Sequence, residues 1–236
     1  LAPADADYVA MSDQDDYWYP EKLETLLREI GEAQLVYSDA RIVRTDGELV
    51  ADTYWSLRRN NHSDLSSLLM ANCVTGAASL CRRSVLDYAL PFPPGQFTHF
   101  HDHWVALTAL TLGDIAFVDR PLYDYVQHGE AVLGHARANQ ITVLRERLAS
   151  LPTLHRNVRE RVGRWRMRYF VDCCRLMQFG TVLKMRCGDH MTAAKRRAID
   201  RFMRAERSPL ALGHLGRRAA REMVGRPETI GAELGL

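Results

Sequence analysis

The alternation of strand-like and helix-like segments over the first half of the chain is the feature that most limits its fold. Short apolar runs at 8–11, 35–37 and 115–118 are typical of buried strands. Between them, residues 20–30 and 102–112 carry apolar side chains at helical spacing. Strands that alternate with helices are typical of layered domains in which helices cover a sheet. We therefore predict an α/β fold for this half.

Turn signals and small residues divide the rest of this half into shorter elements. The Thr-Asp-Gly step at 45–47 lies between two apolar runs and predicts a β-hairpin. Residues 65–70 predict a short helix, and the small residues at 74–81 predict a strand. A further helix is expected within 84–91, where prolines end it, and 122–126 predict another strand.

The second half differs from the first in both pattern and charge. Residues 1–136 have a net charge of −11 and residues 137–236 a net charge of +13. Strand signals stop, and one apolar stripe from Val158 to Leu183 predicts a long helix. Two further basic helices are expected at 193–205 and 212–224. We predict two parts, an α/β domain over 1–136 and a basic helical extension over 137–236.

Composition excludes several classes of protein. No apolar run approaches the roughly 20 residues that cross a bilayer, and the first residues lack the basic start and apolar core of a signal peptide. The five cysteines form no Cys-x-x-Cys pair, as expected of thiols in a reducing compartment. We therefore expect a cytoplasmic location.

Three carboxylates, Asp13, Asp15 and Asp16, follow the first predicted strand directly. Ligands of open α/β sheets bind at the carboxyl ends of strands, and carboxylate oxygens suit Mg²⁺ or Mn²⁺ bound to substrate phosphates. The alternative is a solvated acidic turn that caps the next helix. A calcium loop is excluded, because Trp18 stands where such a loop needs glycine.

Two later residues are candidates for the same chemistry. Asp102 lies at the start of a predicted helix, where it can cap that helix or face a cleft and accept a proton from a hydroxyl. His128 follows a predicted strand, where it can be structural or can complete a metal site begun by carboxylates. The residues alone leave both pairs of alternatives open.

Segments in the right order resemble the family 2 glycosyltransferases of the GT-A fold, in particular the bacterial rhamnosyltransferase-like branch. The matching pieces are Tyr8–Trp18 with Pro20–Leu23, Thr75–Ala77, His101–Trp104 and Tyr125–Gly129. The resemblance implies an incomplete GT-A domain, a Rossmann-like mixed sheet with flanking helices. The family's opening strand and βαβ unit, which bind the nucleotide base, precede the first matching piece. We therefore expect this 236-residue piece to transfer no sugar by itself.

The resemblance also implies roles for individual residues. Asp13 would contact the ribose or sugar of the donor. Asp15 would bind the donor and hold Mg²⁺ or Mn²⁺ together with His128, and Asp102 would deprotonate the acceptor hydroxyl. The acceptor side would be lined by Thr75, Gly76 and Ala77.

The function that follows is inverting, metal-dependent transfer of a sugar, with rhamnose the sugar that the branch suggests. The donor would be a uridine- or deoxythymidine-diphosphate sugar, and the acceptor a cell-surface polysaccharide or a lipid-linked saccharide. The alternatives are a non-catalytic scaffold that binds a partner and a metal-dependent phosphohydrolase. The basic extension either lies on an anionic membrane surface, at the inner face of the plasma membrane, or packs on the catalytic domain. Nucleic acid is disfavoured because no binding motif accompanies the charge.

Overall fold

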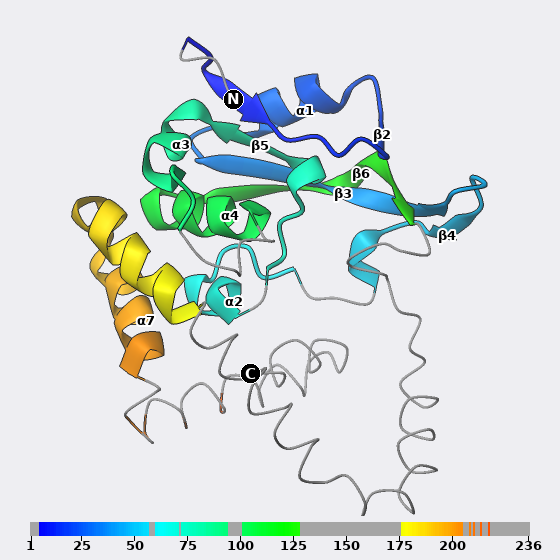
Figure 1. The fold of residues 1–236 in the computed structure, drawn as a ribbon. Coiled ribbons are helices and arrows are strands. Elements are labelled where there is room, and N and C mark those ends of the chain that lie inside the picture. Colours follow the sequence, from blue (N-terminus) through cyan, green and yellow to red (C-terminus); the bar gives the residue numbers. More distant parts are fainter. Residues whose placement is uncertain are drawn as a thin grey trace, which may run out of the picture.

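The computed structural model describes most of the first half of the chain and two helical segments of the second. The described residues are 5–56, 60–70, 72–93, 101–127, 176–204, 208, 210, 213 and 217. They form a mixed α/β structure in which a curled sheet lies between flanking helices (Figure 1). The α/β prediction is confirmed.

The sheet combines one parallel pair with antiparallel neighbours. Its order is β1-β5-β3-β6-β2, with β4 paired to β3. Among the described strands, β3 and β6 are the parallel pair, and the other pairings are antiparallel. The strands are β1 (Tyr8–Ala10), β2 (Tyr17–Trp18), β3 (Leu35–Arg44), β4 (Leu49–Ala51), β5 (Ser79–Arg82) and β6 (Ile115–Gln127).

Helices cover both faces of this sheet unequally. Helix α1 lies on one face, and α4 and α2 lie on the other (Figure 1). The α-helices are α1 (Lys22–Glu29), α2 (Leu65–Met70), α3 (Arg83–Ala89), α4 (His101–Leu112) and α7 (Ala193–Arg204). Short 3-10 helices occur at η1 (Tyr54–Ser56), η2 (Gly76–Ala78) and η4 (Gly188–His190).

Two hydrophobic cores correspond to the two faces. The larger core, on the α4 side, includes Tyr37 of β3 and Trp104 and Leu107 of α4. The smaller core joins Leu26 of α1 to Leu122 of β6. Helix α4 is apolar all round because it is buried on nearly every side, whereas α1 is amphipathic and buries one stripe.

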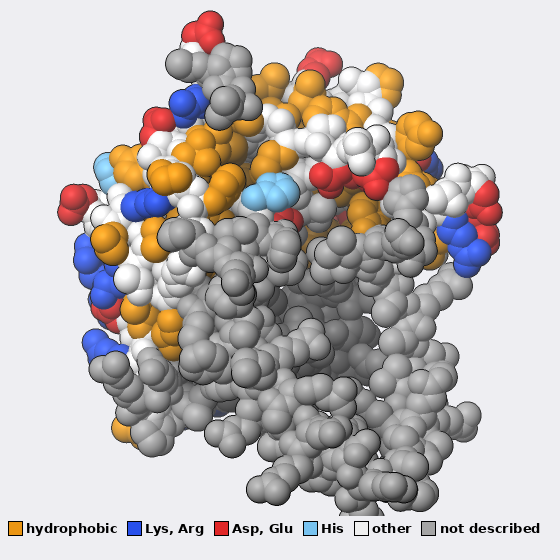
Figure 2. Space-filling view, in the orientation of Figure 1, with side chains coloured by type: hydrophobic (Ala, Val, Ile, Leu, Met, Phe, Trp, Pro, Cys, Tyr) orange, Lys and Arg blue, Asp and Glu red, His pale blue; other side chains and the backbone are white. Residues whose placement is uncertain are grey.

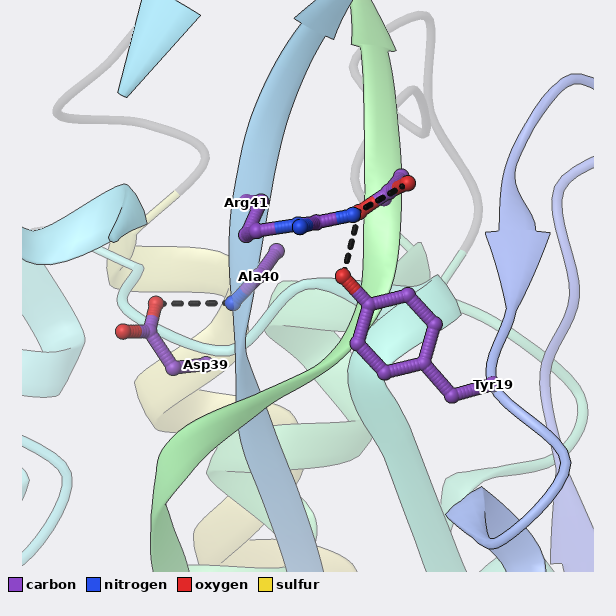
Figure 3. Close-up of polar contacts among 5 residues, drawn as sticks. Tyr19, Asp39, Ala40 and Arg41 are labelled. Atoms are coloured by element: carbon purple, nitrogen blue, oxygen red, sulfur yellow. Dashed lines mark hydrogen bonds and ion pairs between the residues drawn. The ribbon is translucent and has the colours of Figure 1, made fainter. Parts of the chain in front are cut away.

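Strand β3 changes which residues face the larger core partway along its length. Tyr37 faces that core and so does Ala40, although strict alternation would place them on opposite faces. The register of β3 against β6 shifts on both sides of Asp39. As a result Asp39 and Arg41, two residues apart, point to opposite sides of the strand (Figure 3). The Asp39 carboxylate accepts hydrogen bonds from the backbone N–H groups of Ala40 (2.7 Å) and Tyr54 (2.9 Å).

The described helices of the second half pack into the larger core. Phe179 contacts Trp104, with ring centroids 5.2 Å apart, and Leu183 is fully buried. Arg186 donates hydrogen bonds to three carbonyls around α3, including that of Pro91 at 2.7 Å. Of the two alternatives for the basic extension, residues 176–204 therefore show packing on the α/β part. The division of the chain at 136/137 stays a prediction.

Within the described residues, the predicted elements agree with the structure except in three places. Residues 115–118 and 122–126 belong to one strand, β6, which continues through Pro121. The strand predicted over 74–81 is confined to β5, since Gly76–Ala78 forms η2. Strand β2 was not predicted. Of the predicted helix at 212–224, the structure describes residues 213 and 217, both helical, and most of the helix predicted between Val158 and Leu183 lies outside the described residues.

No helix in the described part of the chain is both long enough and apolar enough to cross a membrane.

Candidate active site at the end of the sheet

Residues 11–16, which we call the acidic segment, cross the sheet from one edge strand to the other. The segment leaves β1, which lies at one end of the strand order, and enters β2, which lies at the other. On the way Met11 donates a backbone hydrogen bond to Ser79 (3.4 Å), and Asp16 accepts one from the N–H of Val126 (3.3 Å). The three carboxylates of the segment therefore lie beside the carboxyl end of β6. On the face shown in Figure 2, acidic side chains gather near a histidine.

Lys22 is the buried cation of this site. Only 1% of its surface is exposed, and its Nζ donates a hydrogen bond to the carbonyl of Ala77. The ammonium also lies 3.8 Å from the ring centroid of Trp18 and 4.4 Å from that of Tyr123. Burial lowers the pKa of Lys22 to about 7, although the nearby carboxylate of Asp16 favours the charged form. Lys22 thus joins the acidic segment to the 75–77 segment.

Asp16 has an unsatisfied oxygen in this environment. Its pKa is raised to about 6, chiefly by burial and also by the charges of Asp13 and Asp15, against the hydrogen bond from Val126. Within the described part of the chain, the buried Oδ2 of Asp16 and Nε1 of Trp18 have no hydrogen-bond partner. Unpaired buried polar groups are rare, so these two atoms indicate a site that can accept further partners.

Asp102 enters the same site from α4. The helix begins at His101, so Asp102 lies in its first turn and not before it; its Oδ1 accepts a hydrogen bond from the N–H of His103 (2.7 Å). Burial raises the pKa of Asp102, and the charge of Asp13 raises it too. The two carboxylates are therefore close enough to interact, although they lie far apart in the sequence.

The 75–77 segment fills the space between these carboxylates and the core. A Cβ on Gly76 would lie 3.4 Å from Nε2 of His101, 3.6 Å from Cβ of Asp102 and 3.9 Å from Cβ of Met11. Thr75 interacts with the side chain of Tyr123. The structure thus brings residues 75–77 to Asp102, to Lys22 and to the acidic segment.

The carboxylates fit a divalent cation by their chemistry. Asp13, Asp15 and Asp16 supply hard oxygen atoms, repel one another, and include the unpartnered Oδ2 of Asp16. The described residues contain no group of three or more potential ligands already arranged around a metal position. His128, the other predicted ligand, lies outside the described residues, directly after the end of β6.

Sequence reasoning missed a second polar cluster beside the acidic segment. Arg41 of β3 donates to both carboxylate oxygens of Asp124 on β6, at 2.8 and 3.0 Å. The hydroxyl of Tyr19 donates to the same carboxylate (Figure 3). Burial alone would raise the pKa of Asp124, but the hydrogen bonds from Arg41 and Tyr19 hold it below its ordinary value. Arg41 and Asp124 give no local motif, since only the strand pairing brings them together.

Comparison of the chain with protein-family models gives no match, and the search of curated proteins gives none either.

Proposed function

We propose that this chain is a nucleotide-sugar-dependent glycosyltransferase of GT-A architecture, similar to the rhamnosyltransferase-like branch of family 2. The observation that carries the proposal is that Asp102 and Met11, at the start of the acidic segment, both approach Gly76, and the charge of Asp13 raises the pKa of Asp102. A solvated acidic turn would not need a half-buried carboxylate from a distant helix beside it. In this arrangement the acceptor binds on the side of Asp102 and Gly76, and the donor binds on the side of Asp13 and Asp15.

Asp102 acts as the general base. Its raised pKa makes the carboxylate a better proton acceptor, and its place in the first turn of α4 holds it beside Gly76. It removes the proton of the acceptor hydroxyl while that oxygen attacks the anomeric carbon. The bond from the anomeric carbon to the diphosphate oxygen breaks, and its electron pair leaves with the nucleoside diphosphate. A single displacement of this kind inverts the anomeric centre.

Asp13, Asp15 and Lys22 form the donor side. Asp13 contacts the ribose or sugar, and Asp15 with His128 would hold Mg²⁺ or Mn²⁺. When bound, the cation neutralises charge on the leaving diphosphate. Lys22 fixes the acidic segment against the carbonyl of Ala77, so the donor and acceptor sides keep one spacing.

The partners of the proposed enzyme follow from its reaction. They are a nucleotide sugar and a saccharide or lipid-linked saccharide of the cell surface, and the location is cytoplasmic or peripheral at the inner face of the plasma membrane. The net charge of +13 in residues 137–236 suits an anionic lipid surface.

Binding of Mn²⁺ in the presence of inorganic pyrophosphate tests the proposal without requiring turnover. Electron paramagnetic resonance of the 236-residue chain is expected to show bound Mn²⁺, and Asp15→Asn should weaken binding at least about tenfold, or 1.4 kcal/mol. Asp102→Asn should leave Mn²⁺ binding unchanged, because a base is not a ligand. Asp119→Asn, which removes an exposed carboxylate of β6, is the matched control.

Two results would contradict the proposal. One is a folded chain that binds no Mn²⁺ with pyrophosphate. The other is equal weakening by Asp15→Asn and Asp119→Asn, since the loss would then reflect general negative charge and not a site.

A further inference from the structure

A pocket of about 700 Å³ lies next to the acidic segment, over the part of the sheet that α1 leaves uncovered. Its floor is built from cross-strand pairs. Arg41 of β3 pairs with Asp124 of β6, which pairs in turn with Tyr17 of β2. Directly paired residues point to the same face of a sheet, so these three side chains form one row across three strands. Val43 and Val126 form the next pair along.

The shift in β3 explains why this row faces the pocket. Ala40 and Ile42 face the larger core, so Arg41 and Val43 face the opposite side. That side carries Leu122 and Leu26, which form the smaller core. Without the shift at Asp39, Arg41 would point into the larger core.

The walls of the pocket combine apolar and polar groups. Tyr17 is 71% exposed and Leu49 of the hairpin is 46% exposed, so both offer apolar surface to the pocket. The hairpin turn adds Thr45 and Asp46. Asp15 belongs both to the acidic segment and to the pocket. It lines the pocket, and its charge raises the pKa of Asp16.

The charges of the lining nearly balance, which limits the class of ligand. Three carboxylates and two guanidiniums line the pocket among the described residues, and Arg41 is already paired with Asp124. A free phosphate or sulfate would meet the carboxylates, and a strongly cationic ligand would meet the guanidiniums. A neutral ligand with many hydroxyls and an apolar face suits this lining. Its hydroxyls can bond to polar groups such as Thr45 and Asp124, and its apolar face can lie on the exposed ring of Tyr17.

The geometry points to a saccharide-binding pocket formed by Tyr17, Leu49 and the Arg41–Asp124 pair, which takes a neutral sugar unit. Its volume is within the range of small-molecule sites, about 300–1,000 Å³. The link between this sugar and the transfer reaction rests on the proposed function, in which Asp15, a residue of the pocket lining, belongs to the donor side. Saccharide binding as such does not need the metal.

An array of defined neutral and anionic oligosaccharides, probed with the fluorescently labelled chain in the presence of EDTA, tests this inference. We expect retention on a set of neutral glycans, followed by calorimetric titration with the strongest of them. Tyr17→Ala and Leu49→Ala should each weaken that affinity at least about tenfold. Phe92→Ala, which removes an apolar side chain that is 41% exposed outside the pocket, should not. Far-UV circular dichroism checks the fold of each variant.

The outcomes separate this inference from the proposed function. Three results would each overturn the pocket. They are retention on no glycan, retention only on anionic glycans, and an affinity that is the same for Tyr17→Ala, Leu49→Ala and the unsubstituted chain. Glycan binding that depends on Tyr17 and Leu49 supports it, whether or not Mn²⁺ binds. If Mn²⁺ binding fails while glycan binding persists, the saccharide pocket stands and the proposed transfer reaction falls.

Discussion

The two faces of the sheet divide stability and chemistry between them. The α4 face is covered by α2, α4 and the helices of the second half, and it buries the larger core. On the other face, α1 is the helix that covers the smaller core among the described residues, and the part that α1 leaves uncovered carries Arg41, Asp124 and the pocket. The difference shows that one mixed sheet can bury most of its apolar side chains on one face and keep polar side chains accessible on the other.

The largest expected effect is on the α4 face. Trp104 is 1% exposed, packs against Phe179, and donates a hydrogen bond from its indole to the carbonyl of Ala89 (2.8 Å). Trp104→Ala should lower the free energy of unfolding by about 3–5 kcal/mol, measured by urea denaturation. Leu26→Ala on the α1 face should cost less, about 2–3 kcal/mol. If Leu26→Ala is the more damaging substitution, the unequal division between the faces is wrong.

A smaller effect on the free energy of unfolding is expected from Lys22, which is buried beside Trp18 and the carbonyl of Ala77. Between pH 7 and 10.5 the unfolded chain holds a proton on Lys22 that the folded protein has released. The free energy of unfolding should therefore rise with pH in this window, by about 1–2 kcal/mol from pH 7 to 9.

Lys22→Met should remove this rise, and Lys184→Met, on the partly exposed partner of Asp200, should retain it. Asp16 titrates lower, near pH 6, so it does not contribute in this window. Chemical denaturation at several pH values checks both variants. A rise that persists in Lys22→Met would assign it to another group.

The smallest effect is expected on the pocket floor. Arg41 is 43% exposed, so its ion pair with Asp124 contributes only about 1 kcal/mol or less to stability. Arg41→Ala should leave unfolding nearly unchanged and should raise the pKa of Asp124, which carbon-detected NMR of the carboxyl group can follow. A loss above about 2 kcal/mol would show that the floor belongs to the structural core after all.

Much of the fold was predictable because its elements have strong local signals. The helices α1, α2 and α4 and the hairpin between β3 and β4 follow from apolar spacing and turn residues. Strand β2 was missed because two residues give no periodicity. The strand β6 was divided in two because proline is disfavoured in strands, yet the chain continues in extended conformation through Pro121, which pairs in register with Asp39.

The candidate site was predictable to the extent that its residues form local motifs. Asp13, Asp15 and Asp102 were predicted from their places after a strand and at a helix start, and in the structure the charge of Asp13 raises the pKa of Asp102. Lys22 entered the sequence analysis only within the matching piece Pro20–Leu23 and received no role there, since its burial depends on Trp18 and Tyr123. Arg41 and Asp124 depend on strand pairing and on the shift in β3, which no sequence period records.

That shift decides which side chains β3 presents to each face of the sheet. If residues 35–44 alternated strictly without it, the Arg41 guanidinium would point inward and Ile42 would turn out toward the pocket. A charged group would then lie inside the larger core and an apolar one at the sugar-sized hollow. Deletion of one residue at 38–39 would instead leave Ile42 inward and Arg41 outward, because it removes the one extra step between Tyr37 and Ala40. In a strand of native length, the shift is therefore what lets β3 pack on one face and present its polar row on the other.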